Sequence, residues 1–487
     1  MKGVTRMADR DEQLKQQAYD EVDKNRAEVE RDPYRLTYHI MPPAGLLNDP
    51  NGFIQWNGTY HLFYQWMPFK TGHGAKFWGH YTSDNLVRWS HEEIALAPSE
   101  WYEKNGCYSG SAIDHDGVMT LFYTGNVKDE DGNRETYQCK AVSVDGLHFK
   151  KEGPVITLPE GYTPHFRDPK VWKHGDRWYM IVGAQNIDLE GRAVLFRSDD
   201  LYKWEHLGPI AGSHLGQLGD FGYMWECPDL FPLGGKDVLI ASPQGLEASG
   251  MLYNNVYQAG YFVGELDYKN ARMAHGDFTE LDRGFEFYAP QTTEDDKGRR
   301  ILIAWMGVPD QNEQDQPTVK HKWLHTMTLP RVLALKEGKL IQQPVEELES
   351  LRKNEVTHQG MLLENEEAEY EGISGKAAEL LLEEFSGNAE QFEIGIRGNA
   401  RLLYNNREKR FTLERKSFVD GLTESRHCYL AKLDSIRVFL DASSVEVFLN
   451  GGEEVFTARI FPDPGNGRIV FGAKGNVEFN LKKWDLG

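Results

Sequence analysis

The chain contains 487 residues, of which 12% are aromatic and 48 are glycine. This length suits more than one domain, and the composition suits sheet cores joined by many turns. A total of 75 Asp and Glu residues against 54 Lys and Arg residues gives a formal net charge of −21. Such a charge argues against nucleic acid as a partner, because contact with a phosphate backbone requires a basic surface.

The beginning of the chain, residues 1–32, is a charged extension without a long apolar run. We expect neither a signal peptide nor a membrane span there, but a solvated helix over residues 8–30 that ends before Pro33. The four cysteines show neither CxxC spacing nor a histidine ligand pattern, which predicts reduced thiols and no metal site. Together these features predict a cytoplasmic protein that does not bind membranes.

A repeating unit of roughly sixty residues follows this extension. Each copy reads as two antiparallel strands joined by a glycine turn, such as Asn57-Gly58 in the first copy and Gly175-Asp176 in the third. Five copies are recognisable, and radial repetition of such sheets makes a β-propeller. We therefore predict a five-bladed β-propeller catalytic domain over residues 33–335.

Three of the copies carry an acid just before a proline, at nearly the same phase of the repeat. These motifs are Asp49-Pro50, Asp168-Pro169 and Glu226-Cys227-Pro228. One interpretation is that the acids only shape turns, since Asp-Pro is an ordinary turn dipeptide. The shared phase instead favours three carboxylates that face one axial cavity of the propeller.

After the propeller the pattern changes twice. Pro344 precedes Val345, Leu348 and Leu351 at helical spacing, which predicts an interdomain linker helix within residues 336–354. Residues 355–487 show short alternating segments separated by Gly or Asn turns, which predicts a β-sandwich. Support of the propeller is its expected role, with carbohydrate binding as the alternative. The predicted fold is all-β, a propeller followed by a sandwich, with a short N-terminal helix.

Two or three acids in an aromatic-lined pocket are what glycoside hydrolysis uses. One carboxylate attacks the anomeric carbon, and a carboxylic acid with a raised pKa protonates the departing oxygen. Glu226 lies between Trp225 and Cys227 and has the more apolar sequence neighbours, which favours the role of acid. Asp49 is flanked by asparagines that can hydrogen-bond an ionised carboxylate, which favours the role of nucleophile.

The motifs Asn48-Asp49-Pro50-Asn51-Gly52, Phe166-Arg167-Asp168-Pro169 and Glu226-Cys227-Pro228 resemble the signature motifs of glycoside hydrolase family 32. This family contains invertases, fructanases and sucrose-6-phosphate hydrolases. Tyr108-Ser109-Gly110-Ser111 and Trp78-Gly79-His80 extend the resemblance, which covers most of the chain after residue 33. One departure is visible: members often have Trp-Met before the Asn-Asp pair, where this chain has Leu46-Leu47.

The resemblance implies a retaining mechanism on a β-fructofuranosyl unit, without a cofactor. It assigns Asp49 as nucleophile, Glu226 as general acid/base and Asp168 as transition-state stabiliser. Arg167 is expected to form an ion pair with Asp168, to contact the sugar, or both. The candidate substrate-binding residues are Leu46, Leu47, Asn48, Gln65, Trp78, Tyr108, Ser109, Arg167 and Trp305. Each aromatic residue among them could instead belong to the core of a blade.

Sucrose 6-phosphate and sucrose are the substrates that the resemblance implies. A phosphate needs basic groups near the glucose side of the pocket, and the candidates are Lys76, Lys320, His321 and Lys322, with ordinary surface charge as the alternative. Two other classes are a propeller furanosidase that acts on arabinose-type sugars and a noncatalytic sugar-binding propeller. The first is not expected to combine the Asn-Asp-Pro-Asn-Gly and Glu-Cys-Pro motifs, and the second needs no nucleophile and acid.

Overall fold

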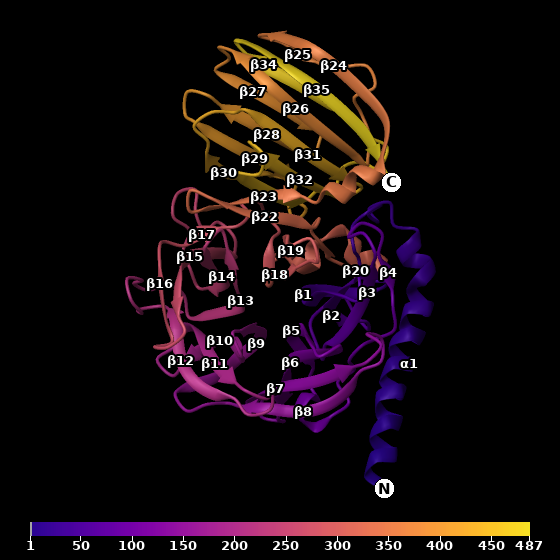
Figure 1. Cartoon of the computed structure of the whole chain (residues 1–487). Coiled ribbons are helices and arrows are strands. Elements are labelled where there is room, and N and C mark those ends of the chain that lie inside the picture. The colour runs from indigo at the N-terminus through magenta and orange to yellow at the C-terminus, as the bar shows by residue number, and fades with distance from the viewer. Residues whose placement is uncertain (1) are drawn as a thin grey trace.

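The computed structural model describes residues 2–487, with side chains from Arg10 onwards. Five β-sheets surround a common axis, and two further sheets stack above them at the C-terminal end of the chain (Figure 1). The helix α1 (Lys2–Glu30) runs along one side of the ring of sheets (Figure 1). This arrangement confirms the predicted all-β fold, with a five-bladed β-propeller, a β-sandwich and an N-terminal helix.

Each blade of the propeller is a sheet of four or five strands. The first contains β1 (Gly45–Trp56), β2 (Thr59–Met67), β3 (Phe77–Ser83), β4 (Ser90–His91) and the late strand β20 (Trp323–Leu324). The second contains β5 (Cys107–His115), β6 (Val118–Lys128), β7 (Arg134–Ser143) and β8 (Lys150–Thr157). The third contains β9 (Tyr162–His174), β10 (Arg177–Asn186), β11 (Gly191–Ser198) and β12 (Glu205–Gly212).

The fourth blade contains β13 (Met224–Leu233), β14 (Lys236–Gln244), β15 (Gly260–Asp267), β16 (Arg272–His275) and β17 (Thr279–Glu280). The fifth contains β18 (Tyr288–Glu294), β19 (Arg300–Met306), β21 (Thr326–Met327), β22 (Arg331–Lys336) and β23 (Lys339–Pro344). Short 3-10 helices lie in the connections, namely η1 (Trp101–Glu103), η2 (Glu313–Asp315) and η3 (Pro317–His321).

The first strand of each blade contacts the first strands of the neighbouring blades: β1 contacts β5 and β18, and β9 contacts β5 and β13. Every one of these inner strands has a β-bulge or irregularity in its pairing. The shifts lie between Leu47 and Pro50, Tyr108 and Gly110, Arg167 and Lys170, Glu226 and Asp229, and Tyr288 and Gln291. A bulge interrupts the ladder and re-aims side chains, so proline is tolerated there. The acid-proline motifs are therefore irregularities within the inner strands and not turns between strands.

The predicted linker helix over residues 336–354 is corrected by the structure. Strands β22 and β23 join β19, so the segment through Pro344 belongs to the fifth sheet. Leu340 and Gln342 of β23 are buried and alternate with more exposed residues, which is the period of a strand. The helical part is only the 3-10 helix η4 (Glu346–Leu351), which buries Leu348 and Leu351.

The C-terminal domain consists of two six-stranded sheets. One contains β24 (Arg352–Glu364), β35 (Asn476–Leu486), β26 (Ala378–Gly387), β31 (Ser435–Asp441), β32 (Ser444–Leu449) and β33 (Glu454–Arg459). The other contains β25 (Glu367–Ala368), β34 (Ile469–Lys474), β27 (Gln391–Ile396), β28 (Ala400–Asn405), β29 (Arg410–Lys416) and β30 (Thr423–Tyr429). Apolar side chains of both sheets form one shared core, as in a sandwich.

The helix α1 is not the solvated helix that its composition predicts. Leu14, Ala18 and Val22 share a face of the helix, and these side chains pack against the propeller core. Val29 packs with Trp323 in a small cluster at the end of the helix. Across the part of the chain that the structure describes, no helix is both long enough and apolar enough to span a membrane.

Candidate active site

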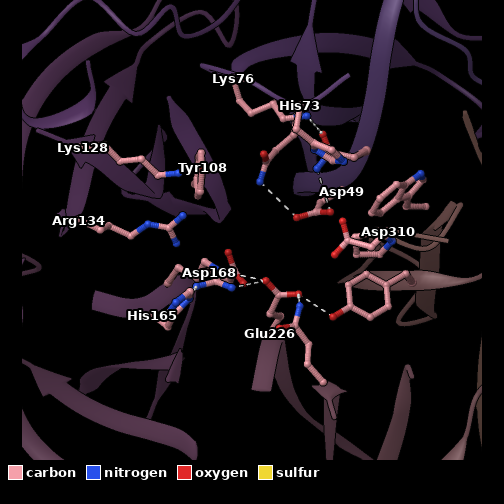
Figure 2. A pocket seen from close by; sticks show the side chains of 18 residues that line it. Asp49, His73, Lys76, Tyr108, Lys128, Arg134, His165, Asp168, Glu226 and Asp310 are labelled. Carbon is pink, nitrogen blue, oxygen red and sulfur yellow. Dashed lines mark hydrogen bonds and ion pairs between the residues drawn. The ribbon is translucent and has the colours of Figure 1, made fainter. Parts of the chain in front are cut away.

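A cavity of about 380 Å³ lies among the inner strands, and all five blades contribute to its wall (Figure 2). Blade residues in this wall are Asn48, Asp49, Gln65, Tyr108, Lys128, Arg134, His165, Arg167, Asp168, Glu226, Gln244, Tyr288 and Trp305. The three acids that share a phase in the sequence therefore line one cavity. Figure 2 shows their carboxylates directed inwards from different blades.

Asp49 lies at the irregularity of β1 and accepts several hydrogen bonds. Its Oδ2 accepts from the Ser109 hydroxyl at 2.5 Å and from Gln65 Nε2 at 3.2 Å, and its Oδ1 accepts from Asn48 Nδ2 at 3.1 Å. Lys76 Nζ donates to Asn48 Oδ1 at 2.6 Å and places a cationic group near the carboxylate. These donors favour the ionised form of Asp49, as a nucleophile requires.

Asp168 has a positive φ of 68°, which an aspartate tolerates better than most residues. Its backbone N–H donates to Thr124 Oγ1 at 3.0 Å, and its Oδ2 accepts from the backbone N–H of Cys227 at 3.0 Å. The Cys227 thiol lies between two acids, with Sγ 3.5 Å from Asp168 Oδ2 and 3.8 Å from Asp49 Oδ2. The irregularities of the third and fourth blades are thus linked, because the Asp168 side chain contacts both the backbone N–H and the thiol of Cys227.

Glu226 is surrounded by donors, which corrects the apolar setting that its sequence neighbours suggest. Its Oε1 accepts from Arg167 Nε at 3.0 Å and from Nη2 at 2.5 Å. Its Oε2 accepts from the Tyr288 hydroxyl at 2.6 Å and from Gln244 Nε2 at 2.7 Å. Arg167 therefore hydrogen-bonds Glu226 of the next blade, and not the adjacent Asp168 as one reading of the sequence expects.

The three acids influence one another's protonation. Burial raises the pKa of Asp49, and the charge of Glu226 adds to this rise, although the hydrogen bond from Ser109 opposes it. Burial also raises the pKa of Asp168 to about 7, against the lowering effect of Arg167 and with the help of the other two acids. Burial acts in the same direction on Glu226, but Arg167 and Tyr288 outweigh it and lower the pKa of Glu226. The acids therefore titrate as a coupled group.

Most of the predicted sugar contacts reach the cavity. Asn48, Gln65, Tyr108, Arg167 and Trp305 line it. Ser109 is absent from the lining, but its hydroxyl donates to Asp49, so it acts on the site through that carboxylate.

The structure corrects three of the predicted sugar contacts. Leu46, Leu47 and Trp78 are fully buried and pack in apolar clusters of the propeller. Trp78 Nε1 donates to the backbone oxygen of Tyr108, so even its polar atom is used within the fold. The departure at Leu46-Leu47 therefore changes the core beneath the site and not its wall.

The predicted phosphate ligands also need correction. Lys320 and Lys322 are exposed and lie outside the cavity wall, and His321 contacts Glu28 of α1 at 3.0 Å. Lys76 does line the cavity, but its ammonium is buried against Asn48, and burial lowers the pKa of Lys76 to about 7.

Several cavity residues were not predicted. Tyr288 lies in the motif Phe287-Tyr288-Ala289-Pro290, where the fifth copy of the repeat has Ala-Pro in place of acid-Pro. The position of Tyr288 in the repeat, equivalent to that of the acid motifs, could have indicated that it reaches the cavity. Lys128 and Arg134 come from strand ends and carry no motif, so only the fold brings them to the cavity. His165 lies within β9, directly before the Phe166-Arg167-Asp168-Pro169 motif, and that position was its available signal.

Family models match almost the whole described structure outside α1. The model "Glycosyl hydrolases family 32 N-terminal domain" matches residues 39–344, and "Glycosyl hydrolases family 32 C terminal" matches residues 347–485. The chain belongs to glycosyl hydrolase family 32. It is thus a glycosidase, and the boundary between the two family models falls at the start of η4.

Relatives of this family 32 chain span its full length. It is 57% identical to the sucrose-6-phosphate hydrolase of Bacillus subtilis (strain 168), over 99% of this chain and 100% of the relative. The solved structure of sucrose-6-phosphate hydrolase from Lactobacillus gasseri is similar with a TM-score of 0.88, 32% identity and 96% of each chain covered. A mutant of the Bombyx mori GH32 beta-fructofuranosidase BmSUC1 in complex with sucrose gives a TM-score of 0.84, 36% identity and 98% of each chain covered.

Proposed function

We propose that the protein is a retaining β-fructofuranosidase that hydrolyses sucrose 6-phosphate and sucrose. The observation that carries this proposal is the convergence of Asp49, Asp168 and Glu226 on one cavity, each from the inner strand of a different blade. Two carboxylic groups and a third acid match what hydrolysis of a glycosidic bond requires. The relatives at 57% identity and at a TM-score of 0.84 support the fructosyl substrate.

The first half of the reaction transfers the fructosyl group to the protein. The Asp49 carboxylate attacks C2 and forms a C–O bond, while Glu226 gives its proton to the glycosidic oxygen as the bond from C2 to that oxygen breaks. Glucose or glucose 6-phosphate leaves. Because Arg167 favours ionised Glu226, this step requires that substrate oxygens take over part of the hydrogen bonding of Arg167.

The second half returns the protein to its starting state. Ionised Glu226 takes a proton from water, the water oxygen attacks C2, and the ester bond to Asp49 breaks to release fructose. Asp168 stabilises the positive charge that develops on the fructosyl ring in both transition states.

The four cysteines are free thiols, which supports the proposal of a reducing, cytoplasmic location.

Single isosteric variants test the proposed roles. We expect Asp49→Asn and Glu226→Gln each to lower kcat by about 10⁴-fold or more, because each removes a group that acts as part of one unit. Steady-state hydrolysis of sucrose and of sucrose 6-phosphate measures the loss, and thermal unfolding checks that the fold is kept. Mass spectrometry of the acid-quenched wild type should find a fructosyl adduct on Asp49. Near wild-type hydrolysis by either variant contradicts the assignment, and binding without hydrolysis by the wild type supports the noncatalytic class.

The substrate preference has its own measurement. The ratio of kcat/KM for sucrose 6-phosphate to that for sucrose should exceed one clearly in the wild-type protein. A ratio near one removes the phosphorylated substrate from the proposal and leaves the fructosidase activity in place.

A further inference from the structure

The hairpin of β6 and β7 ends with two cations that face each other. Lys128 is the last residue of β6, Arg134 is the first residue of β7, and the two are partners in the antiparallel register. Directly opposite residues on such a pair lie on the same face, with Cβ atoms about 5 Å apart. Both side chains line the cavity, and Figure 2 shows them extended into it beside Tyr108.

Two like charges in this position destabilise the free protein unless something compensates them. Within the described residues, neither Lys128 nor Arg134 forms a side-chain hydrogen bond or an ion pair, although the chain holds 75 acidic against 54 basic residues. The turn between them contains Asp129, Glu130 and Asp131. The Asp129 carboxylate accepts from Asn133 within the turn, and none of the three acids forms an ion pair with Lys128 or Arg134 in the described part of the chain. The opposing cations are therefore left without an ion-paired or hydrogen-bonded anion among the described residues, although the charge of Glu226 still acts on Arg134.

The position of this pair fits the leaving group better than the fructosyl group. Asp49 and Asp168 are held deep at the inner irregularities, whereas Lys128 is exposed and Arg134 is half-buried, so the cations lie towards the mouth of the cavity. A group attached beyond the scissile bond extends to this mouth. Another basic residue of the cavity wall, His165, has its Nδ1 3.1 Å from Arg167 Nη1, and partial burial together with Arg167 lowers the pKa of His165 to about 4. It is neutral at pH 7.

A phosphate in this cavity needs cations close by, because four carboxylates, those of Asp49, Asp168, Glu226 and Asp310, line the same space. A guanidinium binds phosphate oxygens in a bidentate manner, and an ammonium adds a compact charge. Burial also lowers the pKa of Arg134, and Arg167 acts in the same direction, so an anion would relieve an unfavourable cation.

We propose that Lys128 and Arg134 together bind the phosphate on the glucosyl part of the substrate. The end of the β6–β7 hairpin is then the element that selects the phosphorylated sugar. This inference rests on the proposed hydrolysis of sucrose 6-phosphate.

The test compares both substrates in Lys128→Gln, Arg134→Gln and the double variant. For sucrose 6-phosphate, kcat/KM should fall about 10- to 100-fold per removed cation, because each loses a charge-assisted hydrogen bond. The loss should be mainly in KM, and it should exceed any loss of kcat/KM for sucrose by about 10-fold or more, because sucrose carries no phosphate; thermal unfolding checks the fold. Lys150→Gln is the matched control, since it removes one exposed charge from β8 of the same blade and should leave the substrate ratio unchanged.

Two further readouts sharpen the result. Glucose 6-phosphate should inhibit the wild type more strongly than glucose, and the double variant should lose this difference. Arg134→Lys should retain part of the preference, because the charge stays and the bidentate geometry goes.

The outcomes separate the two proposals. If the wild type has nearly the same kcat/KM for sucrose 6-phosphate and for sucrose, both the proposed phosphorylated substrate and this inference are wrong. A wild type that prefers sucrose 6-phosphate, combined with a double variant that keeps this preference, overturns the inference alone. An equal loss for both substrates also overturns it, because it assigns the pair to the fold or to the general site.

Discussion

At the scale of single residues, the proton balance of the site depends on which acid each cation contacts. Arg167 and Asp168 are neighbours in sequence, yet the guanidinium hydrogen-bonds Glu226. Motifs predicted the three acids because each acid marks its own copy of the repeat. They could not predict this pairing, because side chains next to each other on a strand point to opposite faces and a bulge changes their aim.

Asp168→Asn tests the coupling among the acids. Asparagine tolerates the positive φ of 68° at this position, so the fold should be retained. We expect kcat/KM to fall about 10²- to 10³-fold because a stabilising charge is lost. The charge of Glu226 raises the pKa of Asp168. This coupling is reciprocal, so the two acids titrate in two steps that belong to the pair, and without Asp168 the Glu226 proton is lost at a lower pH than the second of these steps. The basic limb of the pH profile of kcat/KM, where the acid loses its proton, should move to lower pH. A basic limb at the same pH as in the wild type, or at a higher pH, contradicts the coupling between the acids.

At the scale of elements, the inner-strand irregularities place the chemistry. The sequence contained their phase, since Pro50, Pro169, Pro228 and Pro290 recur just after the site positions. It did not contain their geometry, because an acid-proline pair is compatible with a turn as well as with a bulge. The predicted linker helix reflects a different ambiguity, between a helix and a strand. Apolar spacing around Leu348 was interpreted as a helix, whereas the pairing with β22 makes the preceding segment a strand.

Close packing between blades should be as important as the bulges themselves. A Cβ atom on Gly183 of β10 would lie 2.3 Å from the backbone oxygen of Trp225 and 3.3 Å from the Cα atom of Glu226. We expect Gly183→Ala to destabilise the protein by about 1–3 kcal/mol through overpacking. It should also lower kcat about 10²-fold, because the strand that carries Glu226 must move. Thermal unfolding and kcat measure the two effects. Gly219→Ala is the control, because a Cβ atom on Gly219 meets nothing within 4 Å. If Gly183→Ala keeps the thermal stability and the kcat of the wild type, the contact between β10 and β13 does not hold β13 in place.

At the scale of the whole molecule, buried charges join the sandwich to the propeller. Arg331 of β22 is fully buried, and its Nη1 lies 3.0 Å from Asp282 Oδ2 while its Nη2 lies 2.7 Å from Glu446 Oε2 in the sandwich. His39, just before the first blade, contacts Asp441 Oδ2 at 2.8 Å and Glu446 Oε1 at 3.1 Å. The alternating pattern predicted each domain separately. It could not predict this junction, whose partners lie hundreds of positions apart and carry no local signal.

The buried His39 makes the stability of the assembled molecule depend on pH. Burial alone would lower its pKa, but Asp441 and Glu446 outweigh burial and raise the pKa of His39 to about 9. Its ordinary value is 6.5, so the protonated histidine stabilises the fold fully below about pH 6.5, and this contribution is lost as pH rises through 9. The shift corresponds to about 3 kcal/mol in the free energy of unfolding.

His39→Gln should remove this dependence. Urea unfolding between pH 6 and pH 10 should show that the difference in free energy between wild type and variant is largest at the acidic end and shrinks towards pH 10. His214→Asn, which changes an exposed histidine at a positive φ, is the matched control and should follow the wild type throughout. A difference that stays constant with pH, or grows as pH rises, contradicts a protonated His39 in the junction. The acids lie on the inner strands, whereas His39 lies at the junction between the fifth blade and the sandwich. Protonation of His39 should therefore not affect hydrolysis, and wild type and His39→Gln should show the same pH profile of hydrolysis wherever both proteins remain folded.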